Sequence, residues 1–212
     1  MIVITSKTYH IQLGIFLVIL SSKSNIKIKY KYKGQEKEIF AKLEYYNLTG
    51  SIKDRMANYI ITEAIKNKKL KENMPIIEAT SGNTGISLSA LGAYYKRKVY
   101  IFMPDWVSEE RLKLMKMYGA DVKLFSKEEG GFKKCINEAK KKAKETNGYL
   151  INQFENQNNL IAHYQTTGNE ILNHRYSWKL LFPLFMLGQV NILPATNREN
   201  IAIPAFSLIF IS

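Results

Sequence analysis

Hydrophobic and polar residues alternate along the chain over residues 25–43. Apolar or aromatic residues take every second position in Ile26–Tyr32, and lysines fill the positions between them. Gly34 permits a turn, and the alternation resumes over residues 39–43. A period of two is typical of a strand with one buried face, so this pattern predicts a β-hairpin.

The spacing of apolar residues becomes typical of a helix after Ser51, and then alternates several times between helix and strand spacing. Ser51 offers a hydroxyl cap and Asp54 follows three residues later, which predicts a helix that begins here. Further helices are expected at 86–95, 108–118 and around an apolar stripe over 132–143, and strands at 75–78, 99–102, 122–125 and 149–153. Alternating strands and helices indicate an α/β fold with a mostly parallel sheet and helices on its faces.

The two ends of the chain depart from this rhythm. Ile11–Leu20 is mostly apolar but too short to span a bilayer. Residues 173–212 hold three of the five prolines, one acidic residue and two short apolar runs without a clear period. The chain therefore divides into a divergent segment 1–25, a central region 26–172 and a divergent tail 173–212.

Composition excludes several classes of protein. Of the 212 residues, 46% are hydrophobic and 23% are charged, as in globular domains and unlike collagen or disordered tails. The single cysteine, Cys135, allows no intrachain disulfide, so a reducing, cytoplasmic location is expected. With only three histidines, a zinc site is not expected. Cys135 is predicted to be a small buried apolar residue, and His163 a packing or helix-surface residue.

The chain is strongly basic, with 31 Lys and Arg against 18 Asp and Glu and a net charge of +13. This balance is compatible with a polyanionic partner. However, no arginine cluster, helix-turn-helix or RNA-binding signature accompanies it. We therefore expect neither a nucleic-acid nor a membrane partner, and keep a basic surface binder as the weakest alternative.

Lys53 lies in the first turn of the helix predicted after Ser51, where the helix dipole opposes a positive charge. A partly desolvated lysine at this place favours its neutral amine, which is the nucleophile that forms a Schiff base with an aldehyde. The alternative is a solvated lysine whose charge is offset by the adjacent Asp54. The position by itself leaves both interpretations open.

Thr80–Gly85 (TSGNTG) directly follows a predicted strand, at the end where α/β sheets bind ligands. Its two glycines let the backbone approach a ligand, its hydroxyls and amide supply hydrogen-bond donors, and the helix behind it directs N–H groups at an anion. Such a loop suits a carboxylate or a phosphate. A plain glycine-rich turn is the alternative.

Together, the two clusters resemble the cysteine synthase and cystathionine β-synthase family, the fold type II enzymes that depend on pyridoxal phosphate. The family motif Asn-Pro-Thr-Gly-Ser-x-Lys-Asp-Arg corresponds to Asn47–Arg55, and Thr-Ser-Gly-Asn-Thr-Gly corresponds to Thr80–Gly85. Further matches lie at 103–105, 119–122, 129–132, 152–154, 166–168 and 170–171. The resemblance covers residues 26–172 and implies a three-layer α/β/α fold, like that of the tryptophan synthase β chain, that is incomplete in its C-terminal half.

The resemblance also implies roles for individual residues. Lys53 matches the lysine that binds pyridoxal phosphate covalently and later removes the α-proton of the substrate, and Asn83 matches the residue that hydrogen-bonds the ring hydroxyl of the cofactor. The α-carboxylate of the amino-acid substrate is expected on Thr80, Ser81, Thr84 and Gln153. The implied reaction is β-replacement, in which O-acetylserine and sulfide give cysteine and acetate. Relatives of this kind are usually homodimers, so a homodimer is implied here.

Three departures from the family pattern bear on activity. Leu48 replaces a proline, the Gly-Asn-Thr-Pro-Leu element expected before Ile26 is absent, and the glycine-rich phosphate loop expected beyond Gly168 does not occur in residues 173–212. Each charge-assisted hydrogen bond to a phosphate contributes about 1.5–3 kcal/mol, so losing this loop predicts weak cofactor binding. We therefore predict a truncated relative.

Two sets of alternatives to cysteine synthesis remain at the level of the sequence. Because the phosphate loop is missing, the chain could be an inactive remnant of the family or a non-enzymatic partner of an intact paralogue. Among enzymes, cystathionine β-synthase and serine dehydratase are the competing specificities.

Overall fold

The computed structural model describes residues 25–32, 34–170 and 208–211. The helices in these residues are α1 (Lys53–Lys66), α2 (Asn83–Tyr94), α3 (Glu109–Met117), α4 (Gly131–Thr146), α5 (Gln157–His163) and the π-helical turn η1 (Tyr164–Gly168). The strands are β1 (Asn25–Tyr32), β2 (Gln35–Leu43), β3 (Ile76–Ala79), β4 (Val99–Pro104), β5 (Asp121–Phe125), β6 (Tyr149–Leu150) and β7 (Leu208–Ile211).

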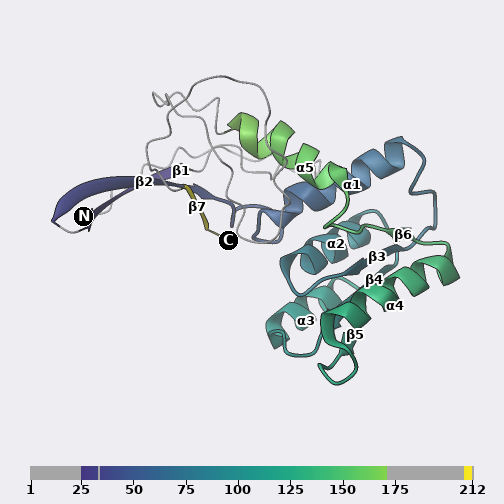
Figure 1. The fold of residues 1–212 in the computed structure, drawn as a ribbon. Helices are drawn as coiled ribbons and strands as arrows, with labels where there is room; N and C mark the ends of the chain where they lie inside the picture. The colour runs from purple at the N-terminus through teal and green to yellow at the C-terminus, as the bar shows by residue number, and fades with distance from the viewer. Residues whose placement is uncertain (1–24, 33, 171–207, 212) are drawn as a thin grey trace.

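The central element of the fold is a four-stranded sheet with the strand order β5-β4-β3-β6. All three of its strand pairs are parallel, and in the central pair Ile76 lies opposite Val99. Each connection between neighbouring parallel strands passes through a helix, as the sequence rhythm predicts. The predicted α/β class with a mostly parallel sheet is confirmed (Figure 1).

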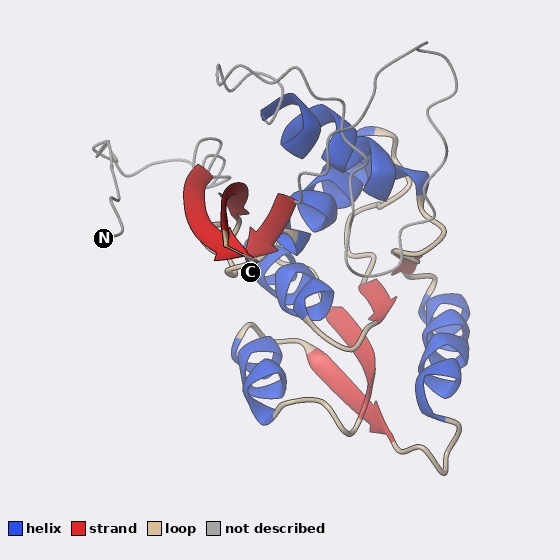
Figure 2. Cartoon of the chain, turned by 60° about the vertical axis from the view of Figure 1, so that its left-hand side comes forward, coloured by secondary structure: helices blue, strands red, loops and turns tan. Residues whose placement is uncertain are grey.

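Helices cover both faces of this sheet and give it two hydrophobic cores. Alternate residues of β3 face opposite sides, so Ile76 packs with residues of α1, α2 and α3, whereas Ile77 packs with residues of α4. Cys135 lies fully buried in the α4 core, as predicted. The result is the three-layer α/β/α arrangement that the sequence implies (Figure 2).

A second, smaller sheet has the order β1-β2-β7. β1 and β2 pair antiparallel, which confirms the predicted hairpin. β7 pairs parallel with β2, and Ala41 lies opposite Ile209. Residues 173–212 show no clear apolar period, so this strand was not predicted. The remaining predictions for segments 1–24 and 171–207 lie outside the described residues.

Two predicted element boundaries are wrong for identifiable reasons. The first long helix begins at Lys53 rather than Ser51, with Ile52 as its N-cap and no side-chain cap. Ser51 Oγ accepts a hydrogen bond from the Lys53 N–H at 3.2 Å, but the Asp54 carboxylate binds Thr49 and does not complete a capping box. The strand predicted over 149–153 is assigned only for Tyr149–Leu150, because Asn152 has a φ of 52° and turns the chain.

No helix in the described part of the chain combines the length and apolar character that crossing a membrane requires.

Candidate functional site

The loop Thr80–Gly85 lies between the end of β3 and the first turns of α2, at the predicted edge of the parallel sheet. The Thr80 N–H donates to the carbonyl of Phe102 at 3.0 Å, which continues the pairing with β4 by one residue. The Thr80 side-chain oxygen then accepts the Gly82 N–H at 3.3 Å. The chain therefore turns sharply from the strand into the helix, with Ser81 exposed at the turn and Asn83 half-buried.

Gly85 allows α2 to pack closely against α3 and the end of β3. A Cβ atom at this position would lie 2.9 Å from the Met115 side chain and 2.9 Å from Cγ2 of Thr80, closer than real Cβ atoms come. A larger residue would push the first turn of α2 away from the loop. The glycine that the family motif requires here is thus explained by packing.

Two of the predicted substrate residues, distant in sequence, meet at this loop. Thr84 Oγ1 donates to Gln153 Oε1 at 2.7 Å, and both side chains are buried. Thr80 is also buried, whereas Ser81 is exposed and its carbonyl oxygen accepts Nη1 of Arg111 at 3.4 Å. The structure therefore brings Thr80, Thr84 and Gln153 to one sheet edge and leaves the Ser81 side chain at the surface.

Lys53 is the first residue of α1, and its side chain is half-buried. Burial lowers the pKa of its amine below the ordinary lysine value. Asp54 does not offset this charge, because its carboxylate accepts the Thr49 N–H at 2.7 Å and the Thr49 hydroxyl at 2.6 Å. Of the two interpretations of this lysine, the geometry favours a desolvated amine over a solvated ion pair.

The turn that leads into α1 is held by side-chain hydrogen bonds. Nδ2 of Asn47 donates to Glu44 Oε2 at 2.6 Å and to the Ser51 carbonyl at 3.0 Å. The hydroxyls of Thr49 and Ser87 lie 3.2 Å apart, which ties this turn to α2. Leu48, which replaces the family's proline, is exposed and takes no part in these contacts.

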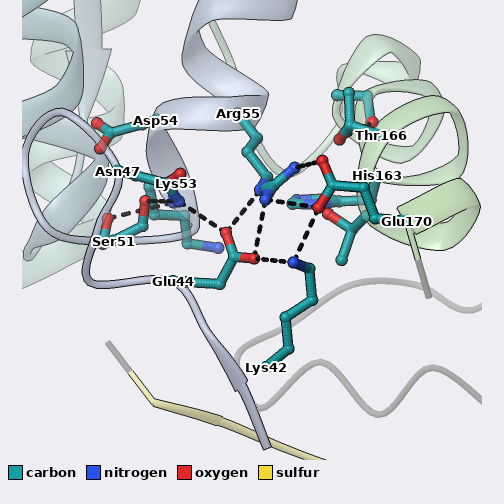
Figure 3. Close-up of polar contacts among 12 residues, drawn as sticks. Lys42, Glu44, Asn47, Ser51, Lys53, Asp54, Arg55, His163, Thr166 and Glu170 are labelled. Atoms are coloured by element: carbon teal, nitrogen blue, oxygen red, sulfur yellow. Dashed lines mark hydrogen bonds and ion pairs between the residues drawn. The ribbon is translucent and has the colours of Figure 1, made fainter. Parts of the chain in front are cut away.

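Behind Lys53 lies a group of four charged residues, Lys42, Glu44, Arg55 and Glu170, which we call the charge cluster (Figure 3). Arg55 Nε lies 2.6 Å from Glu44 Oε2, and Arg55 Nη1 lies 2.7 Å from Glu170 Oε1. Lys42 Nζ lies 2.8 Å from Glu170 Oε2. Three of the side chains are fully buried and only Glu170 is partly exposed, so two cations and two anions neutralise one another inside the protein.

His163 lies at the end of α5, beside the charge cluster (Figure 3). It is almost fully buried, so it is a packing residue and not a helix-surface one. Its Nδ1 lies 3.2 Å from the Thr167 hydroxyl, and its Nε2 is buried without a hydrogen-bond partner among the described residues. Burial, and then the charges of Lys53 and Arg55, lower the pKa of His163 to about 4.

The sequence indicated no functional role for Glu44, Glu78 or Glu170, and His163 was expected only as a packing or helix-surface residue. Of these, Glu78 carried a visible signal, because a lone carboxylate within a short apolar strand contradicts the burial expected there. Glu170 was noted only as part of the family pattern. Nothing in the sequence indicates that it would reach Arg55, which lies 115 residues earlier.

Comparison with known proteins gives a consistent result. The sequence pattern of the family described as "Pyridoxal-phosphate dependent enzyme" matches residues 26–179. The chain is 43% identical over 134 residues to cysteine synthase B of Escherichia coli, covering 63% of this chain.

Solved structures show the same likeness. A hydrogen sulfide-producing enzyme from Fusobacterium nucleatum matches with a TM-score of 0.70 at 47% identity, over 73% of this chain and 47% of that one. A cysteine synthase from Entamoeba histolytica matches with a TM-score of 0.64 at 36% identity, over 79% of this chain and 52% of that one. The chain spans 44% of the length of the E. coli relative.

Proposed function

The chain belongs to the pyridoxal-phosphate dependent enzyme family, and from this premise we propose that it carries out cysteine synthase chemistry, the replacement of the β-substituent of O-acetylserine by sulfide. The observation that carries the proposal is the Lys53 amine, which is half-buried, has a lowered pKa and lies at the start of α1. A neutral amine is what condensation with an aldehyde requires. The cysteine synthases among the similar proteins support the choice of reaction.

The residues present fit the reactive end of the cofactor. Lys53 offers an amine with no acidic partner in the part of the chain that the structure describes, and the buried Nε2 of His163 has no partner there either. A buried polar atom without a partner is costly, so its presence near the lysine indicates that the site is complementary to a further polar group. We propose Lys53 as the covalent anchor and Asn83 as the partner of the ring hydroxyl.

The loop and its neighbours supply a place for the substrate carboxylate. Thr84 and Gln153 already contact each other, and the N–H groups of the first turn of α2 favour an anion at this position. We therefore propose that Thr80, Ser81, Thr84 and Gln153 hold the α-carboxylate. The pyridine ring of the cofactor supplies the electron sink for the reaction, while Lys53 accepts and returns the α-proton.

We assign no residue to the phosphate of the cofactor, so covalent capture by Lys53 is the first property to test. Adding pyridoxal phosphate is expected to give an absorbance band near ~410–420 nm, and borohydride reduction should then fix the cofactor on the peptide that contains Lys53. Lys53→Ala should lose both signals. Lys66→Ala is the matched control, because Lys66 is an exposed lysine at the other end of α1. A band without mass addition at Lys53, or no band at saturating cofactor, contradicts the proposal.

Substrate assays separate the competing specificities. We expect acetate and cysteine from O-acetylserine and sulfide. Cystathionine from serine and homocysteine, or pyruvate from serine, would instead indicate the two alternative reactions. An inactive chain that still captures the cofactor on Lys53 would match the remnant hypothesis.

We further propose that the chain forms a homodimer and works in the cytoplasm. The homodimer is proposed because related enzymes of the family are usually homodimers, and light scattering of the purified protein tests it. The cytoplasmic location is supported by the single cysteine, which suits a reducing compartment.

A further inference from the structure

Glu78 is a carboxylic acid inside the hydrophobic core of the sheet. It lies on β3 between two neighbouring strands, β4 and β6, and its side chain is 2% exposed. Ile77 and Ala79 belong to the core under α4, and Glu78 lines the cavity on that side of the sheet together with Ala79 and Phe132. A carboxyl group at such a place is costly unless its oxygens are bound.

Backbone N–H groups occupy both oxygens of this carboxylate. Oε1 accepts the N–H of Ala79 at 2.8 Å, and Oε2 accepts the N–H of Gln153 at 3.2 Å. The second contact joins residues that are 75 positions apart, at the point where the chain leaves β6. Both contacts require an acceptor, which is what the ionised carboxylate offers.

Gln153 is thus fixed at three points. Glu78 holds its N–H, Nδ2 of Asn159 donates to its carbonyl at 2.9 Å, and its side-chain Oε1 accepts the hydroxyl of Thr84 at 2.7 Å. The side-chain contact lies at the loop to which we assigned the substrate carboxylate. The backbone contacts determine where that side chain can reach.

We infer that Glu78 is the positioning residue of the candidate site, and that its carboxylate holds the backbone of Gln153 so that the Gln153 amide meets Thr84. The part of this inference that concerns substrate rests on the proposed function. The contact between Glu78 and Gln153 does not.

This positioning depends on pH. Burial is the largest effect on Glu78 and raises its pKa to about 8, although its backbone hydrogen bonds oppose the shift. When Glu78 takes up a proton, one oxygen carries a hydrogen and can no longer accept equally well from both N–H groups. The hold on Gln153 is therefore strongest above pH 8 and weakens below it.

Other ionisable groups around Glu78 do not account for this behaviour. α2 carries no charged side chain along its length. The ionisable groups at the candidate site are Lys53, Asp54, Arg55, Arg111 and His163, and Lys140 and Glu155 line the α4 cavity together with Glu78. None of them is among the causes of the Glu78 pKa shift.

The inference is tested on the full chain without cofactor by NMR spectroscopy. In the unmodified chain, the backbone amide and the side-chain amide of Gln153 should titrate together with a midpoint near pH 8. In Glu78→Gln, both titrations should disappear. Glu155→Gln is the matched control, because Glu155 is an exposed neighbour that contacts Asn152, and it should leave both titrations in place.

Two results would overturn the inference. One is a Gln153 backbone amide that does not shift over the pH range in which the Glu78 carboxyl carbon itself titrates in the unmodified chain. The other is a backbone amide that titrates while the side-chain amide stays unchanged, since Glu78 would then not position the side chain. Both are read in the unmodified chain, so a folding defect of Glu78→Gln would not obscure them.

Kinetics of the loaded protein give an independent measurement. Glu78→Gln should raise the KM for the amino-acid substrate about tenfold with little change in kcat, because it weakens substrate binding and the transition state equally. A lower kcat with an unchanged KM contradicts this role. If the unmodified chain fails to bind cofactor, the proposed function fails, but the NMR result still decides whether Glu78 positions Gln153.

Discussion

Three ionisable side chains at the candidate site are buried or half-buried without an oppositely charged partner among the described residues. They are Lys53, Glu78 and His163, and burial is the largest cause of each pKa shift. Burial lowers the pKa of Lys53, lowers that of His163 to about 4 and raises that of Glu78 to about 8. Each group is thereby driven toward its neutral form. Groups perturbed in this way concentrate at functional sites, and the charge of Lys53 contributes to the shift of His163.

His163 makes the stability of the protein depend on pH in a defined window. Because its pKa is near 4 in the folded chain and about 6.5 when unfolded, the unfolded chain binds more protons between these values. The free energy of unfolding should therefore rise by about 3 kcal/mol as the pH increases from 4 to 6.5. This contribution should be absent in His163→Gln, as measured by urea unfolding at several pH values. A difference between the two proteins that does not change with pH would contradict the prediction.

At the residue scale, the sequence predicts groups whose position in an element already suggests chemistry. Lys53 at a helix start and the loop Thr80–Gly85 after a strand are of this kind; the structure places Lys53 at the first position of α1 and the loop directly after β3. Their roles toward cofactor and substrate stay predictions. Glu78 and His163 could not be selected in this way, because their properties come from burial by distant segments.

At the scale of elements, the charge cluster joins three parts of the chain. Lys42 comes from β2, Arg55 from α1, and Glu170 follows η1. A buried ion pair adds little stability compared with an apolar pair of the same size, but removing one partner leaves a charge uncompensated. The cluster therefore matters mainly for assembly. The buried charge on α1 is compensated only when α1, β2 and the residue after η1 are packed together.

Arg55→Met tests this condition. The substitution leaves Glu44 and Glu170 facing Lys42 alone, so the unfolding free energy should fall by about 3–5 kcal/mol. Lys113→Met is the control, because it removes an exposed pair with Glu109 at 3.1 Å and should change stability by less than about 1 kcal/mol. Urea unfolding of both variants measures the difference. Equal effects would show that the cluster is no more important than a surface pair.

The elements themselves were largely predictable because their apolar periodicity matches their burial. α4 shows this, since the predicted stripe over 132–143 is the side that packs on the sheet. Boundaries were less predictable, because a single local contact decides them. The bond of Asp54 to Thr49 removes the expected cap, and the turn at Asn152 shortens β6. β7 depends on pairing with β2 across more than 160 residues, and no local pattern indicates it.

At the scale of the molecule, the two hydrophobic cores share the same strands. Ile76 and Ile77 are neighbours in β3 but belong to opposite cores, as do Ile101 and Phe102 in β4. Because both cores pack on the same strands, unfolding these strands exposes the apolar residues of both cores. We therefore expect the four-stranded sheet and the helices on both faces to unfold as one unit.

Cys135 reports on this cooperativity because it is the single thiol of the chain. It lies on α4, fully buried against the sheet, and burial raises its pKa to about 11, so it should react with iodoacetamide only after α4 leaves the sheet. If the cores unfold together, the urea midpoint of thiol labelling should equal that of the helical circular dichroism signal. Arg55→Met, which acts on the opposite face, should then lower both midpoints by the same amount. Thiol labelling at a lower urea concentration than the loss of helix would instead show that α4 opens independently of the core under α1 and α2.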